Sequence, residues 1–89
     1  MKSATLVVKN KLGLHARVAA QIVRTANGFE SEIHLSNDNH SANARGIMGL
    51  MMLAATQGTT LNLVVDGTDE ETAFNAMKEI FESSFGDDT

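Results

Sequence analysis

This chain of 89 residues contains no cysteine, proline, tryptophan or tyrosine. Without cysteine, neither disulfide bonds nor a thiolate metal site can stabilise it, so the hydrophobic residues, 43% of the chain, must form the core alone. The length suffices for one core, and we expect a single domain over residues 1–89. Long apolar runs are also missing, because the first one ends at Lys9, too early for a signal peptide or a membrane span. We therefore expect a cytoplasmic protein that does not insert into membranes.

Acidic residues are missing from the first third of the chain. Residues 1–29 carry five cations and no carboxylate, whereas residues 66–89 carry eight carboxylates and one lysine. This segregation predicts an electropositive N-terminal region that attracts acidic partners or phosphate. We expect no binding to nucleic acid, because five cations without tyrosine or tryptophan make a weak surface for it.

The hydrophobic pattern predicts seven elements in the order βαββαβα. This order favours an α+β fold, an open-faced β-sandwich in which a four-stranded antiparallel sheet has three helices on one face. Residues 61–65 are the most strand-like and should be central, whereas the polar residues 40–44 should form an edge strand. The expected strands are Thr5–Val8, Glu32–Ser36, 40–44 and Leu61–Val65, and the expected helices are Ala16–Ala26, Ile47–Ala55 and a last helix that ends near Ser84.

Two helix ends carry sequence signals of their own. Asn27 and Gly28 predict that the first helix stops in a left-handed conformation. Thr68 and Glu71 predict a capping box at the start of the last helix, in which Thr68 caps the amide of Glu71 and Glu71 reaches back.

His15 lies between Gly13 and the start of the first predicted helix, with Arg17 two residues further on. The first turn of a helix has backbone N–H groups without intrahelical partners, and these groups favour an anion. Arg17 adds a planar cation that suits phosphate oxygens. These parts can accept a phosphoryl group and release it again. The sequence offers no P-loop, magnesium cage or second catalytic base, so it indicates a carrier loaded by other proteins rather than an enzyme, with no cofactor.

The two remaining histidines and the methionines support different interpretations. His34 and His40 fit ordinary surface positions, and no histidine pair has the spacing of a helical metal site, so we expect no metal.

The segment Ile47–Leu53 has no polar side chain and cannot turn every residue inward on a short helix. Ile47, Met48 and Met51 are therefore candidates for an exposed apolar surface that docks partners.

Two segments are similar to signatures of a known family. Gly13–Ala19 resembles the phosphohistidine motif of HPr, the histidine-containing phosphocarrier of the bacterial phosphotransferase system, and Arg45–Met51 resembles that family's regulatory-site helix. The resemblance implies that His15 accepts phosphate on Nδ1 from enzyme I and passes it to an enzyme IIA domain of a sugar permease. It implies that Arg17 and the backbone amides of Ala16 and Arg17 surround the phosphate, and we expect the protein to be a monomer. It also implies partner contacts through Arg17, Ala20, Arg24, Ile47, Met48, Met51 and Met52.

The chain departs from the family pattern at two positions. Val18 replaces the usual proline, which predicts a less rigid turn and one additional N–H donor. Gly46 replaces the serine that a kinase phosphorylates in regulated members, so that regulatory serine is missing, and nothing marks Ser41 or Thr56 as a substitute. Residues 10–13 and the tail 84–88 resemble carriers of the nitrogen-related branch, which leaves the sugar and nitrogen branches both open.

Two alternative functions fit parts of the pattern. The first is a regulatory protein-binding module that docks through Met48 and Met51 and whose affinity is toggled by phosphorylation of His15. The second is a ligand-sensing domain of the ferredoxin-like kind, which would dimerise edge to edge.

Overall fold

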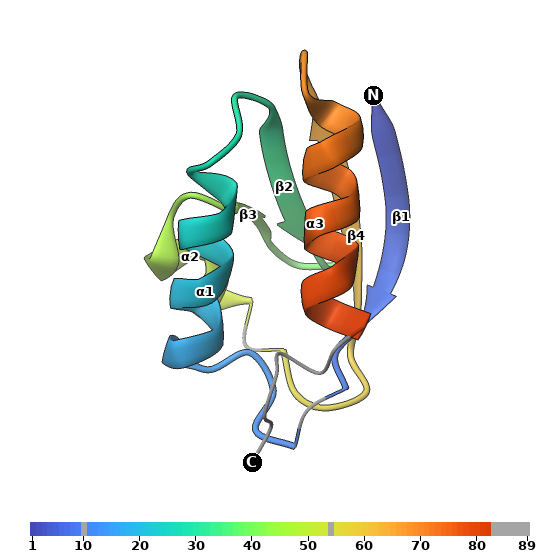
Figure 1. Cartoon of the computed structure of the whole chain (residues 1–89). Coiled ribbons are helices and arrows are strands. Elements are labelled where there is room, and N and C mark those ends of the chain that lie inside the picture. The colour runs from blue at the N-terminus through green and yellow to red at the C-terminus, as the bar shows by residue number, and fades with distance from the viewer. Residues whose placement is uncertain (10, 54, 83–89) are drawn as a thin grey trace.

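A computed structural model describes residues 1–9, 11–53 and 55–82 of the chain. Its four strands form one antiparallel sheet in the order β1-β4-β2-β3, and the helices lie on one side of that sheet (Figure 1). The elements are β1 Lys2–Val7, α1 Ala16–Ala26, β2 Glu32–Ser36, β3 Ser41–Asn43, α2 Ile47–Met52, β4 Thr60–Asp66 and α3 Glu70–Glu82.

The predicted architecture is confirmed in both its element order and its sheet. β4 pairs with β1 on one side and β2 on the other, so the strand expected to be central is interior. β3 pairs with β2 alone and is an edge strand, as its polar sequence predicts. Leu63, in the middle of β4, faces Ala4 of β1 and Leu35 of β2 in the register.

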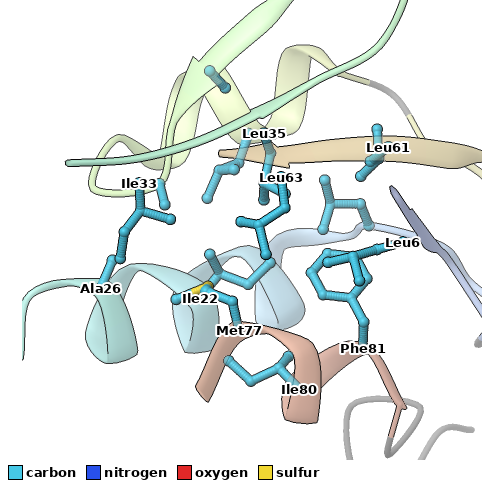
Figure 2. Close-up of a cluster of buried hydrophobic side chains, with 14 of the residues drawn as sticks. Leu6, Ile22, Ala26, Ile33, Leu35, Leu61, Leu63, Met77, Ile80 and Phe81 are labelled. Atoms are coloured by element: carbon cyan, nitrogen blue, oxygen red, sulfur yellow. The ribbon is translucent and has the colours of Figure 1, made fainter. Parts of the chain in front are cut away.

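The core lies between the sheet and the helices. Alternate strand residues such as Ile33, Leu35 and Leu63 are fully buried, whereas their neighbours in sequence are wholly or partly exposed on the open face. The helices meet this layer with one apolar stripe each (Figure 2). Ile22 and Ala26 come from α1, and Met77, Ile80 and Phe81 come from α3.

Several predicted boundaries need correction. α1 has the predicted bounds, but α2 ends at Met52 instead of Ala55, and Leu53 and Ala55 are buried without being helical. β1 begins and ends earlier than predicted, at Lys2 and Val7. The predicted end of the last helix near Ser84 lies outside the described residues, as do Ala54, Asn10 and the tail 84–88.

The conformation predicted after α1 is wrong, although its position is right. Asn27 has φ −69° and ψ −12°, which is the right-handed helical region. The N–H groups of Gly28 and Phe29 donate to Thr25 and Ala26, each three residues back. The helix therefore ends by tightening into short turns, which satisfies its last carbonyls without a left-handed residue.

The predicted capping box at Thr68 is also wrong. α3 begins at Glu70, so Thr68 lies too early to cap it. Its hydroxyl donates to Glu30 Oε1 at 3.5 Å instead. Glu70, not Glu71, reaches back, because its Oε1 accepts the N–H of Gly67 at 3.1 Å.

Candidate functional site

His15 is the N-cap residue of α1. Its backbone is extended, with φ −96° and ψ 178°, and Ala16 begins the helix. Its carbonyl accepts the N–H of Ala19 at 2.9 Å, which is the first hydrogen bond of the helix. In the part of the chain that the structure describes, the half-buried imidazole makes no capping hydrogen bond to α1. The side chain is thus placed at the N-terminal end of a helix without being used to cap it.

The loop before His15 is held by a tight backbone contact. Gly13 has φ +72°, a conformation that side-chain-bearing residues rarely adopt. A Cβ atom on Gly13 would lie 2.4 Å from the carbonyl oxygen of Ala55, so only glycine fits there. The adjacent Leu14 N–H donates to that same oxygen at 2.8 Å. The loop of His15 is therefore fixed against the segment that follows α2.

Exposed cations lie along α1 and on the loop before it. Arg17 is exposed in the first turn of α1, which carries no acidic residue, and Arg24 is exposed in the last turn. Lys9 and Lys11 are exposed near the start of the loop. Lys2, at the start of β1, has its Nζ 3.8 Å from Glu71 Oε2 on α3.

Two acidic residues, Asp66 and Glu70, lie at the opposite end of the sheet and contact the N-terminus. The N-terminal ammonium of Met1 lies 2.9 Å from Glu70 Oε2 and 3.8 Å from Asp66 Oδ1. In Figure 1 the N-terminus and the start of α3 lie at the top, whereas α1 begins at the bottom. The carboxylates at the start of α3 therefore lie at the end of the molecule opposite to the start of α1, whereas the last turn of α3, which carries Glu79 and Glu82, lies at the same end as His15.

The exposed apolar surface predicted from the methionines lies on α2. Met48 is 73% exposed and Met52 61%, whereas Leu50 on the other face is fully buried. Ile47 and Met51 are exposed as well, at 39% and 37%. We call Ile47, Met48, Met51 and Met52 the α2 patch.

The α2 patch lies close to α1. The two helices are in contact and lie side by side in Figure 1. Ala20, the small residue predicted to contact partners, is half-buried on α1. Sequence reasoning missed Leu12, which is 63% exposed on the loop of His15. Its signal was an apolar residue beside Lys11 in a polar loop.

The two departures from the family motifs have clear structural settings. Gly46 is the N-cap of α2, with φ −112° and ψ 111°, and a Cβ there would lie 3.7 Å from its nearest neighbour, the carbonyl oxygen of Asn43. The backbone would therefore accept a serine that the sequence lacks. Val18 is buried in the core, 3% exposed. Thr56, an exposed hydroxyl near the loop, pairs with Thr59 at 3.3 Å.

The other two histidines lie on the sheet and its turn. His34 is half-buried on β2, with Nε2 3.6 Å from Glu32 Oε1, and His40 is exposed. Across residues 1–9, 11–53 and 55–82, no three histidine, cysteine or carboxylate side chains gather as metal ligands. Over the same residues, no helix is long and apolar enough to cross a bilayer.

Known proteins share this arrangement. The family model "PTS HPr component phosphorylation site" matches residues 2–83. A phosphocarrier protein HPr of Xylella fastidiosa (strain 9a5c) is 50% identical over 84 residues, which cover 94% of each chain. The crystal structure of HPr-C-His from Thermoanaerobacter tengcongensis superposes with a TM-score of 0.93 at 46% identity, covering all of both chains. The HPr dimer from the same organism superposes with a TM-score of 0.77 at 47% identity, covering 98% of this chain and 100% of that one.

The matches in sequence and in fold define a phosphoryl carrier of the phosphotransferase system, an intermediate in phosphotransfer and not an enzyme. The chain belongs to the HPr family. The resemblance stated for Gly13–Ala19 and Arg45–Met51 is thereby confirmed, and the ferredoxin-like alternative is excluded.

Proposed function

We propose that His15 is the phosphoryl acceptor of this carrier. In the proposed relay it takes the group from phosphorylated enzyme I and passes it to an enzyme IIA domain. The observation that carries the proposal is the placement of His15 at the N-cap of α1 with its imidazole unused for capping. His34 and His40 have no comparable position, because they lie on a strand and a turn.

The chemistry needs few groups. A ring nitrogen of neutral His15 attacks phosphorus, and the bond from phosphorus to enzyme I breaks as the new P–N bond forms. Ala16 and Arg17 are the first two residues of α1, so their backbone N–H groups belong to the helix end that favours an anion. An anion at such a position gains about 0.3–1 kcal/mol from the helix dipole. The Arg17 guanidinium supplies a permanent charge beside it.

The docking surface in this proposal combines Arg17, Ala20 and Arg24 of α1 with the α2 patch. The contact between the two helices supports one continuous footprint. An apolar centre with cationic residues at its margin suits a partner that presents an apolar pocket bordered by carboxylates.

The acceptor is tested with labelled phosphoenolpyruvate and enzyme I. The wild-type chain should take up one label, which is released on incubation with an enzyme IIA domain. His15→Ala should abolish uptake, while the matched variants His34→Ala and His40→Ala should keep it. Label that persists on His15→Ala would overturn the assignment of the acceptor. Running the assay with the enzyme I of the sugar branch and that of the nitrogen branch decides which relay the chain serves.

We further propose that the whole function resides in one domain over residues 1–89 and that the protein acts as a cytoplasmic monomer. The match over the whole length of an HPr chain supports a single domain. Membership in a family of phosphotransferase-system carriers supports the cytoplasm. Sedimentation equilibrium should give the monomer mass of 9.5 kDa. A concentration-dependent mass of twice that value would contradict the monomer.

A further inference from the structure

Methionine carries all the sulfur of this chain. There are five methionines and no cysteine, tryptophan or tyrosine. Methionine is therefore the side chain that a peroxide oxidises most readily here. Three of the five, Met48, Met51 and Met52, lie on α2, spaced so that they share one face of the helix.

The five methionines differ sharply in access to solvent. Met48 and Met52 are 73% and 61% exposed, and Met51 is 37% exposed. Met77 is fully buried in the core between α3 and the sheet. Met1 is exposed, but it lies beside Glu70 at the opposite end of the molecule. An oxidant in solution therefore meets three thioethers together in the α2 patch.

We propose that Met48, Met51 and Met52 form an oxidation site at which hydrogen peroxide disables docking. In the reaction, a sulfur lone pair attacks one peroxide oxygen, an S–O bond forms as the O–O bond breaks, and the second oxygen leaves as water. The thioether is oxidised by two electrons to the sulfoxide, and the peroxide is reduced. The proposal rests on the docking role proposed above for the α2 patch.

The consequence for docking follows from the polarity of the sulfoxide. A sulfoxide oxygen is a strong hydrogen-bond acceptor, and burying it against an apolar partner leaves it unsatisfied. One such group should weaken docking about tenfold or more. His15 is not altered, so the loss should appear as a higher KM for the carrier in the enzyme I reaction, with kcat retained. Methionine sulfoxide reductases reverse the change.

The experiment treats the full chain with hydrogen peroxide and follows two quantities. Peptide mass spectrometry should find sulfoxide first at Met1, Met48 and Met52, then at Met51, and last at Met77. In parallel, phosphotransfer from enzyme I should show a KM that rises with sulfoxide content and returns after reductase treatment. Circular dichroism monitors whether the fold is intact throughout.

The matched variants are Met48→Leu/Met51→Leu/Met52→Leu, which removes the three exposed thioethers, and Met77→Leu, which keeps them. Each variant is compared only with itself before and after peroxide. The triple variant should show no rise in KM, whereas Met77→Leu should show the wild-type rise. An equal rise in the triple variant, or no rise in the wild type despite complete oxidation of Met48 and Met52, would overturn the proposal. Failure of the untreated wild type to accept phosphate would instead overturn the proposed function.

Discussion

Asp69 holds Ser31 by two hydrogen bonds, one from the backbone N–H at 2.9 Å and one from the hydroxyl. The same carboxylate accepts the N–H of Glu30 at 2.9 Å. Since Ser31 directly precedes β2 and Asp69 directly precedes α3, these contacts join two elements that are distant in sequence. These hydrogen bonds lower the pKa of Asp69 from its ordinary value, and the bond from the Ser31 hydroxyl has the largest effect.

The tie at Asp69 predicts a loss of stability in acid. Because the folded state lowers the pKa of Asp69, its contribution is complete above the ordinary value of 3.8 and is lost as the pH falls through the lowered value. We expect Asp69→Asn to reduce the free energy of unfolding at neutral pH and to flatten its decline in acid. Urea unfolding at several pH values measures both. Asp38→Asn, on the exposed turn after β2, is the matched control, and equal behaviour of the two variants would contradict the prediction.

The backbone contact of Gly13 predicts a large effect of one methyl group. In Gly13→Ala the new methyl group has to accept a positive φ and also collides with the carbonyl oxygen of Ala55. In Gly58→Ala the backbone also has a positive φ, +91°, but no atom lies within 4 Å of the new methyl group. The left-handed conformation alone costs roughly 1–2 kcal/mol for an L residue. We expect Gly58→Ala to lose about that much stability and Gly13→Ala to lose more. Equal losses in urea unfolding would show that the close approach to Ala55 carries no energy.

Removing the guanidinium of Arg17, two residues after His15, should slow phosphotransfer while leaving the fold intact. We expect Arg17→Ala to lower the rate from enzyme I on the order of tenfold to a hundredfold, because a fixed positive group at the phosphate is removed. Arg17→Lys should recover part of the rate, since it keeps the charge but not the planar fork. Arg24→Ala, at the far end of α1, should alter KM more than kcat. Rapid-quench kinetics gives the rates, and a rate unchanged in Arg17→Ala would remove this residue from the site.

A charge placed in the α2 patch should weaken docking. Met48→Lys puts an ammonium at the most exposed position of the patch, where a partner would have to strip it of water. We expect KM for the enzyme I reaction to rise about tenfold with kcat unchanged. Ser3→Lys adds the same charge on exposed β1 and should leave KM as it is. A similar rise in both variants would point to net charge instead of the patch.

The N-cap of α2 should gain stability from a serine. Gly46→Ser adds a capping hydroxyl and removes the freedom of glycine in the unfolded chain, and the site has room for it. We expect the free energy of unfolding to rise by about 0.5–1 kcal/mol. Gly46→Ala should gain only the part due to chain entropy. If alanine stabilises as much as serine, the hydroxyl does not cap the helix.

The sequence predicts best where one local pattern decides the structure. The stripe of Ile22 and Ala26 defined α1 to the residue, because apolar spacing and polar flanks agree there. It predicts less well where distant contacts decide. The predicted α2 ran on to Ala55 because Leu53 and Ala55 are apolar. An apolar residue indicates burial and not helical structure, and both residues are buried outside the helix.

The predictions for the candidate site also succeeded where the evidence is local in sequence and failed where it is not. His15 was found because its glycine, its helix start and Arg17 are all close in sequence. The contact of Gly13 with Ala55 could not be found, since it joins loops far apart in the chain. The predicted capping box failed for a related reason. α3 starts after Asp69, whose carboxylate bonds to Ser31, a partner that no local pattern reveals.

The backbone tie between Leu14 and Ala55 fastens the reactive loop to the chain just beyond α2. If partners dock on α2 as proposed, each meets the loop of His15 at the same distance from that helix. In the proposed relay, donor and acceptor proteins of different shape can use the same alignment in turn, because a main-chain hydrogen bond sets the spacing.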